Sequence, residues 1–283
     1  MKVLIIGAKG LLGQALADAF SDGNELFLWD KEDVDITRIQ DTRDKILEAR
    51  PDVVINSAAY NDVDGAESNP ELAKNINGYA VGNLARVCKE IGPILVHYSS
   101  EYVFDGRVEQ GYSESDTPSS LNVYGNSKLL GEQELQKNTD KFYLLRLSRM
   151  FGKPAAAATS KKSFVELMIS LAKTKESIDV VDDELSCMTY APDLAERTKY
   201  ILENKLPFGI YHCANEGSAT WYGFAQEIFK ISKINVKLNS VSSDHFLPRP
   251  AKRPQYGILL NTKLPLQRSW REALKEFLNS SKL

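Results

Sequence analysis

Tyr124 and Lys128 are the residues whose spacing most directly suggests chemistry. Of the twelve tyrosines in the sequence, Tyr124 alone is followed by a lysine four residues later. Both lie in a segment of helical periodicity, so their side chains are expected on one face of a helix. Tyrosine, with an ordinary pKa of about 10, is a slow acid–base group at neutral pH. A nearby ammonium favours the phenolate and lowers that pKa. The pair therefore predicts proton transfer to or from a substrate oxygen, as in the reduction of a ketone by a hydride.

Polar side chains also follow the short apolar run Ile94–Tyr98, which we expect to be a strand. Binding groups gather at the carboxyl ends of strands in sheets of this kind, and Ser100 and Glu101 lie there. We predict that Ser100 polarises a substrate carbonyl and that Glu101 is an auxiliary acid or an orienting acceptor. The candidate catalytic residues are therefore Ser100, Glu101, Tyr124 and Lys128.

A glycine-rich segment, residues 7–13, joins the predicted strand Val3–Ile6 to the predicted helix Leu11–Phe20. Glycine at such positions lets the backbone turn tightly and approach a pyrophosphate, and the helix N-terminus supplies free N–H groups. The spacing Gly-x-x-Gly-x-x-Gly, directly after a first strand, predicts a dinucleotide site, although a glycine-rich turn without a ligand would look similar. The residues of this segment expected at the cofactor are Gly7, Gly10, Leu11, Leu12 and Gly13.

Asp30 ends the second predicted strand, seventeen residues beyond Gly13. An acidic residue in this position commonly binds the ribose hydroxyls of the adenosine half. Lys31 follows at once and could instead accommodate a 2′-phosphate. The two residues leave NADH and NADPH both open as the cofactor.

The elements that position these residues alternate between buried strands and helices, which predicts a doubly wound parallel sheet, the Rossmann fold of the α/β class. Pro70 and Asn69 predict the start and the N-cap of one long helix. We expect strands at Val3–Ile6, Glu25–Trp29, Val53–Asn56, Ile94–Tyr98 and Phe142–Leu147, and helices at Leu11–Phe20, Arg38–Ala49, Pro70–Glu90 and Val123–Lys137.

The regular alternation of predicted strands and helices ends after residue 150. We therefore divide the chain into a dinucleotide-binding domain, residues 1–150, and a mainly substrate-binding lobe, residues 151–283. Lys153–Lys162 reads as a loop, and three prolines make Phe246–Pro254 extended or turning. Some segments of the second half are expected to return to the sheet. Helices are predicted at Ser163–Lys173, Ala191–Asn204 and Trp221–Lys230, and short strands at Asp179–Val181 and Ile210–Cys213.

Composition narrows the class of protein. A net charge of −3 and 43% hydrophobic residues are ordinary for a globular domain and argue against nucleic-acid binding. The three cysteines are widely spaced, which predicts free thiols, and no histidine or cysteine spacing suggests a metal site. The first apolar run is too short for a signal peptide or a membrane span, so we expect a cytoplasmic protein.

Several motifs resemble the dTDP-4-dehydrorhamnose reductase family, and the resemblance extends along nearly the whole chain. A Pro-Ala-x-Arg-Pro block near the C-terminus is the most specific of them. Besides residues 7–13, the motifs are Asn56-Ser57-Ala58-Ala59-Tyr60, Tyr102-Val103-Phe104-Asp105-Gly106, Leu121–Leu129, Val180-Val181-Asp182-Asp183, Thr189-Tyr190-Ala191, Trp221-Tyr222 and Arg249–Pro254.

The resemblance implies NADPH- or NADH-dependent reduction of the 4-keto group of a dTDP-6-deoxyhexulose, the last step in making dTDP-L-rhamnose for cell-surface polysaccharide. The implied partner is a dTDP-sugar, and a homodimer stays open. The motifs add Ala58, Ala59 and Tyr60 to the expected cofactor contacts. Expected substrate contacts are Tyr102, Phe104, Arg149, Trp221, Arg249 and Arg253.

The sequence departs from the family mainly around the substrate. Ser99-Ser100-Glu101 stands where Ser-Thr-Asp is usual, and Ser186-Cys187-Met188 where Gly-Ser-Pro is usual. Arg149 replaces a tryptophan, and the exchange of an aromatic wall for a cation points to a different sugar. Ala15 stands where some members place a magnesium-binding glutamate, so no metal-bridged dimer is expected.

Two alternatives stay open. A sister nucleotide-sugar reductase or epimerase of the extended short-chain dehydrogenase/reductase type would keep the same motifs. A non-catalytic NADP-binding regulatory subunit, like that of methionine adenosyltransferase, could also retain them. The Arg-Pro block favours the reductase over the epimerase.

Arg249 and Arg253 lie four residues apart in the proline-fixed segment, with Lys252 between them. Prolines leave this backbone little freedom, so the arginines could be preorganised for a diphosphate. The competing interpretation makes them surface charges on a loop between lobes. Arg149 is the next candidate for the diphosphate.

Overall fold

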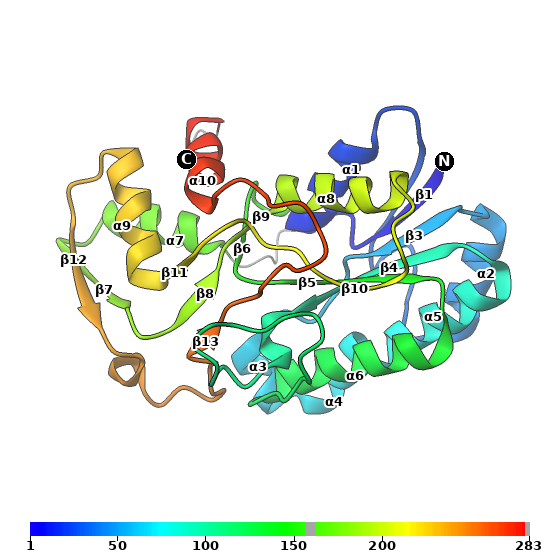
Figure 1. Cartoon of the computed structure of the whole chain (residues 1–283), viewed down its shortest axis with the longest axis horizontal. Coiled ribbons are helices and arrows are strands. Elements are labelled where there is room, and N and C mark those ends of the chain that lie inside the picture. Colours follow the sequence, from blue (N-terminus) through cyan, green and yellow to red (C-terminus); the bar gives the residue numbers. More distant parts are fainter. Residues whose placement is uncertain (157–161, 281–283) are drawn as a thin grey trace.

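The computed structural model describes residues 1–156 and 162–280 and contains a six-stranded parallel sheet in the order β10-β5-β4-β3-β1-β2 (Figure 1). Val3, Leu4 and Ile5 are fully buried, as expected for a strand covered on both faces. The predicted doubly wound Rossmann fold is confirmed. The strands are β1 (Lys2–Ile6), β2 (Glu25–Trp29), β3 (Val53–Asn56), β4 (Ile94–Ser100), β5 (Phe142–Leu147) and β10 (Gly209–His212).

Helices cover both faces of this sheet (Figure 1). One face packs against α1 (Leu11–Phe20) and α8 (Ala191–Glu203), and the other against α2 (Ile39–Ala49), α5 (Ala80–Ile91) and α6 (Val123–Asn138). β4 runs two residues beyond the predicted Ile94–Tyr98, so Ser99 and Ser100 belong to the strand itself.

The long helix predicted from Pro70 is irregular. It consists of α4 (Pro70–Lys74), a π-helical turn (Asn75–Tyr79) and α5, and a further helix, α3 (Val63–Ser68), precedes it. Asn69 occupies the predicted N-cap position of α4, but its side chain makes no capping hydrogen bond there and its amide donates to the carbonyl of Gly65 in α3. The π turn lies against α6, where a Cβ on Gly131 would come within 2.1 Å of the Asn77 carbonyl oxygen. Gly131 therefore allows the two helices to approach closely.

The second lobe has its own apolar core around Trp270 and Phe224, both nearly inaccessible to solvent. Its helices are α7 (Phe164–Ala172), α9 (Trp221–Ser232) and α10 (Trp270–Ser280). Short strands complete it: β6 (Met150–Phe151) with β9 (Thr189–Tyr190), β7 (Ser177–Val181) with β12 (Lys237–Val241), and β8 (Leu185–Cys187) between β11 (Ser218–Thr220) and β13 (Tyr256–Gly257).

The chain returns from the second lobe to the sheet, as expected. β10 pairs with β5, and α8 covers the face shared with α1. Pro250–Pro254 contains no helix or strand, and a 3₁₀ turn (Ser243–Phe246) precedes it. Part of the predicted loop Lys153–Lys162, residues 157–161, lies outside the described residues. Within the described ranges no helix is long and apolar enough to span a membrane.

Candidate active site

The glycine loop, residues 7–13, lies between β1 and α1 and folds as its glycines require. Gly7 has φ of +82°, and a Cβ there would lie 2.8 Å from the Ala58 nitrogen; a Cβ on Gly13 would lie 2.1 Å from the Gly7 carbonyl oxygen. Gly10 differs, because its added Cβ would meet only that same oxygen, at 3.1 Å. Gly7 and Gly13 therefore maintain the fold of the loop, while Gly10 presents bare backbone to the cavities beside it.

Two adjoining cavities meet at Gly10. The first, here the Asp30 cavity, has a volume of about 530 Å³, and the second, the Tyr124 cavity, about 430 Å³. Gly10, Ser57, Ala58, Ala59 and Asn61 line both, so the two form one elongated site. A long ligand with a phosphate in its middle, such as a nicotinamide dinucleotide, fits this shape and the open backbone of Gly10.

Asp30 and Lys31, which the sequence predicts at the ribose end of a cofactor, both line the Asp30 cavity. The Asp30 carboxylate accepts hydrogen bonds from the backbone N–H groups of Lys9 (3.1 Å) and Lys31 (2.9 Å). Lys9 also pairs with Glu32 at 2.8 Å. Carboxylates, which suit ribose hydroxyls, and ammonium groups, which suit a 2′-phosphate, thus lie together at the Asp30 cavity. The side chains alone therefore do not select NADH over NADPH.

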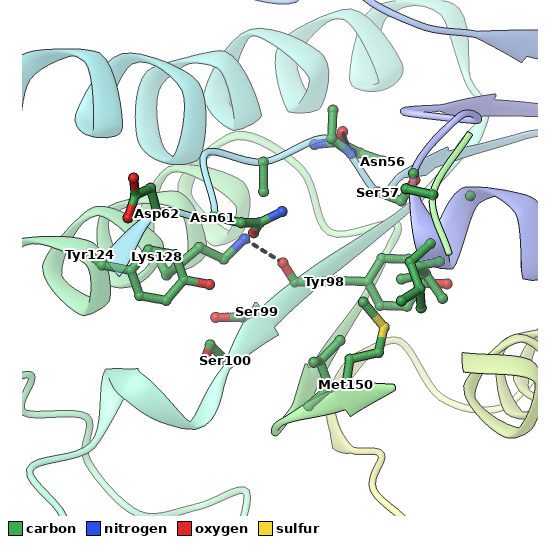
Figure 2. Close-up of a pocket in the computed structure, with 18 residues that line it drawn as sticks. Asn56, Ser57, Asn61, Asp62, Tyr98, Ser99, Ser100, Tyr124, Lys128 and Met150 are labelled. Carbon is green, nitrogen blue, oxygen red and sulfur yellow. Dashed lines mark hydrogen bonds between the residues drawn. The ribbon is translucent and has the colours of Figure 1, made fainter. Parts of the chain in front are cut away.

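Tyr124, Lys128 and Ser100 all line the Tyr124 cavity (Figure 2). Lys128 Nζ donates to the Tyr98 carbonyl at 2.6 Å, which fixes the ammonium beside β4. The Ser100 hydroxyl interacts with the Tyr124 phenol and donates to Glu101 at 2.7 Å. The structure therefore brings together the serine, tyrosine and lysine that the sequence places on two separate elements.

The pKa of Tyr124 is raised well above its ordinary value by burial, with further increases from the charges of Glu101 and Tyr102. Ser100 acts in the opposite direction. The sequence predicts that Lys128 lowers this pKa. In the structure the Lys128 ammonium instead donates to the Tyr98 carbonyl, and burial is the largest influence on the pKa of Tyr124. Tyr124 is consequently held in its neutral form, as a proton donor requires.

Burial also lowers the pKa of Lys128, to about 8 from an ordinary 10.5, while Glu132 partly opposes the shift. Between these two pH values the unfolded chain binds more protons than the folded one, so stability rises as the pH rises. We expect the free energy of unfolding of the protein to increase by about 3 kcal/mol relative to Lys128→Met over this window. Urea unfolding of both proteins at pH 7.5, 9 and 10.5 measures the difference, and a difference independent of pH would contradict the assignment.

Asn77, in the π-helical turn, connects the segment around Tyr60 to α6, and the sequence does not predict this role. Its side chain donates to the Tyr60 carbonyl (3.0 Å) and accepts from the Tyr60 N–H (2.8 Å). It also donates to the Ser127 hydroxyl (2.9 Å), which in turn donates to the Tyr124 carbonyl (2.6 Å). Tyr60 therefore serves through its backbone, which holds the segment containing Ala58 and Ala59 in place.

A buried ion pair lies one helical turn beyond Lys128. Arg146 on β5 makes two hydrogen bonds to the Glu132 carboxylate, at 2.9 and 2.6 Å, and His212 Nε2 is 3.4 Å from the same guanidinium. Burial lowers the pKa of His212 to about 4, so the imidazole is neutral beside Arg146. The pair anchors α6 to β5 of the sheet.

Two predicted site residues lie in the interior instead of on a cavity wall. Glu101 is buried and its pKa is raised by burial, so it supports Ser100 from behind and does not line the described cavities. Phe104 is 1% exposed and stacks on Tyr112 at 4.3 Å, so its prediction as a substrate contact is corrected to a core role. Tyr102 is closer to the site, with its ring edge-on to Tyr124 at 5.5 Å.

A third cavity, the arginine cavity, has a volume of about 490 Å³ and contains the predicted pair Arg249 and Arg253. It adjoins the start of α6, where Leu121 lines it three residues before Tyr124. Arg253 makes three hydrogen bonds, to both Asp64 oxygens (2.9 and 2.7 Å) and to the Ala251 carbonyl. Arg249 makes a single hydrogen bond among the described residues, to Glu184 at 2.6 Å.

Arg149 does not reach a described cavity, contrary to expectation. Its guanidinium donates to the carbonyls of Ala219 (3.2 Å) and Glu184 (3.1 Å) and lies 4.1 Å from the Trp221 ring centroid. It is therefore a buried cation that joins Glu184, just before β8, to β11 and the start of α9, and Trp221 is its stacking partner. This interior position replaces the direct substrate contact predicted for Arg149, while the contact predicted for Trp221 stays a prediction.

A glycine loop at the head of a doubly wound sheet, together with serine, tyrosine and lysine on one adjoining cavity, defines an oxidoreductase of the extended short-chain dehydrogenase/reductase class. The family described as RmlD substrate binding domain matches residues 1–283. The chain belongs to the dTDP-4-dehydrorhamnose reductase family. In the described residues, no group of three or more histidine, cysteine or acidic side chains could hold a metal ion.

Individual relatives agree with this membership over nearly their full lengths. A dTDP-4-dehydrorhamnose reductase of Burkholderia thailandensis is 33% identical, covering 93% of this chain and 92% of the relative. The spore coat polysaccharide biosynthesis protein SpsK of Bacillus subtilis is 34% identical, covering 98% and 96%. The crystal structure of a dTDP-4-dehydrorhamnose reductase from Bacillus anthracis in complex with NADP has a TM-score of 0.94 at 34% identity, covering 99% of each chain.

Proposed function

We propose that the protein reduces dTDP-4-dehydro-L-rhamnose to dTDP-L-rhamnose with NADPH or NADH. The observation that carries the proposal is the convergence of Tyr124, Lys128 and Ser100 on a cavity that meets the glycine loop at Gly10. The named relatives and the NADP complex of the Bacillus anthracis protein support it. A cytoplasmic location and a homodimer stay predictions.

Each of the three cavities suits a different part of the two ligands, the dinucleotide and the sugar nucleotide. Residues 7–13, Asp30 or Lys31, Ala58 and Ala59 would hold the dinucleotide, which supplies the hydride when bound. The arginine cavity adjoins the start of α6 at Leu121 and is suited to the diphosphate of the sugar nucleotide. The sugar would then reach the Tyr124 cavity across the start of that helix.

Tyr124 would give its phenolic proton to the C4 oxygen as the carbonyl carbon receives the hydride, so that one proton and one hydride reduce the ketone to an alcohol. Ser100 has one hydroxyl proton, which it donates to Glu101 in the structure. When the substrate binds, it would turn this proton to the same C4 oxygen. Lys128 supplies positive charge close to the phenolate that remains and stabilises it.

A direct assay tests the function and separates the alternatives. Purified protein mixed with NADPH and the enzymatically prepared 4-keto sugar nucleotide should consume the reduced nicotinamide in a one-to-one ratio with alcohol formed. A nucleotide-sugar epimerase would interconvert sugars without net consumption of NADPH. A regulatory subunit would bind NADPH in a titration and leave both compounds unchanged, and either result would overturn the proposal.

Arg249 is the arginine best placed to contact the diphosphate, because Arg253 is already committed to an ion pair with Asp64 and a hydrogen bond to the Ala251 carbonyl. We expect Arg249→Ala to raise the Michaelis constant for the nucleotide sugar about tenfold or more, in keeping with the loss of a charge-assisted contact. Affinity for NADPH should be unchanged.

Arg107→Ala provides a matched control, since that side chain is 81% exposed and its single ion pair within the described part of the chain is with the nearby Asp105. Isothermal titration with dTDP at saturating NADP⁺ compares the two variants. Equal affinities for dTDP would remove Arg249 from the substrate site.

A further inference from the structure

Glu184 is a buried acid between two arginines, one on each side. Its side chain is 6% exposed, and its carboxylate lies 2.6 Å from Arg249 Nη1 and 3.9 Å from Arg149 Nη2. A buried carboxylate is stable only while a cation or a set of donors neutralises it. Glu184 has two such cations, although one guanidinium is enough to balance the single negative charge of its carboxylate.

Arg149 is the permanent partner of the two. Two backbone carbonyls and the face of Trp221 hold its guanidinium, and its side chain is as buried as that of Glu184. Arg149 therefore cannot leave the cluster without leaving its own charge unpaired in the interior.

Arg249 is the exchangeable partner. Its side chain is 22% exposed, it lines the arginine cavity, and the bond to Glu184 is its single hydrogen bond among the described residues. Its remaining guanidinium N–H groups are available on the cavity side. If Arg249 turns to another anion, Glu184 can move its charge toward Arg149 and stays compensated.

We propose that Glu184 is an affinity-determining counter-ion: it holds Arg249 while the substrate site is empty and competes with the diphosphate for it. The inference rests on the proposed function, in which the arginine cavity takes the diphosphate of a nucleotide sugar. Binding exchanges one anionic partner of Arg249 for another, and the net gain in affinity is the difference between the two. Glu184 thereby keeps the affinity for the nucleoside diphosphate low enough for the product to leave.

The sign of the effect separates this role from a merely structural one. Glu184→Gln keeps the shape of the side chain and removes the competing charge, so the counter-ion role predicts tighter binding of dTDP, by about tenfold for one charge near the anion. A residue that only holds Arg249 in place would, on replacement, weaken binding. The measurement is isothermal titration of the full chain with dTDP at saturating NADP⁺, together with kcat for the reductase reaction, which should fall as product release slows.

Two further variants control for charge and for folding. Asp183→Asn removes the same charge from the wall of the same cavity, from a carboxylate bound to Ser243 and not to Arg249. It should change the affinity for dTDP less than Glu184→Gln does, and an equal gain would assign the effect to the charge of the cavity and not to competition for Arg249. The double variant Glu184→Gln/Arg149→Met removes the competitor and the buried cation together, which leaves the net charge of the cluster as before. It should also bind dTDP more tightly than the parent, and it covers the case in which Glu184→Gln alone does not fold.

The outcomes distinguish failure of the inference from failure of the function. If Arg249→Ala weakens dTDP binding but both Glu184 variants bind it no tighter than the parent, the diphosphate site stands and the counter-ion role is overturned. If Arg249→Ala leaves dTDP binding unchanged, the assignment of the arginine cavity falls, and the inference falls with it.

Discussion

Replacing Tyr124 by phenylalanine is expected to lower kcat at least about 10²-fold, the usual contribution of a positioned general acid. The change removes one hydroxyl from a ring that is 9% exposed and keeps the packing against Tyr102. The affinity for NADPH should change little, because the glycine loop and the Asp30 end are untouched. Steady-state kinetics with the 4-keto sugar nucleotide, and a fluorescence titration with NADPH, measure the two effects separately.

Tyr102→Phe is the matched control for this experiment. It removes the same group from the neighbouring ring, which lies edge-on to Tyr124 and does not line the Tyr124 cavity. Its kcat should stay within a few-fold of the parent. A Tyr124→Phe protein with near-normal kcat, or equal losses in both variants, would remove Tyr124 from the proposed acid–base role.

Substituting valine for Gly10 should abolish binding of the dinucleotide while the fold is retained. The branched side chain would project from the backbone at the junction of the Asp30 and Tyr124 cavities, where we place the pyrophosphate. Gly10 has β-region backbone angles, φ −69° and ψ 166°, which valine adopts easily. Only the Gly7 carbonyl oxygen, 3.1 Å from the added Cβ, must shift slightly.

Gly13→Val tests the contrast within the same loop. Its Cβ would lie 2.1 Å from the Gly7 carbonyl oxygen, so the loop itself must rearrange and the thermal midpoint should fall sharply. Gly10→Val should keep a midpoint close to that of the parent in the absence of cofactor. Measurable NADPH affinity in a folded Gly10→Val protein would show that the pyrophosphate lies elsewhere.

Strong periodicity was sufficient to predict the sheet and several of its helices. The bounds of α1, β2, β3 and β5 agree with the prediction to the residue, because buried strands and amphipathic helices carry clear patterns. The helix α10 was omitted although Trp270, Ala273, Leu274 and Phe277 have helical spacing and are buried. The two- and three-residue strands of the second lobe are too short to have a detectable period.

Residues of the candidate site could be predicted where the chemistry of the side chain itself indicates a role. They could not be predicted where the role depends on the direction in which an ordinary side chain points. Tyr124, Lys128 and Ser100 follow from chemistry alone. Asn77 could not be predicted, because its role depends on a π-helical turn that aims an ordinary amide at Tyr60 and Ser127. Arg149 was misplaced for the same reason: the sequence shows a cation after β5, but only the structure shows its guanidinium turned toward Trp221.

The return of the chain to the sheet limits how the protein can be divided for expression. A fragment ending at residue 150 would lack β10 and α8, which leaves one edge of β5 unpaired and the face beside α1 uncovered. An exposed parallel edge next to bare apolar side chains is a template for aggregation. Limited proteolysis between the lobes should therefore give nicked protein that stays associated and not two stable halves, so the lobes are best studied within the intact chain.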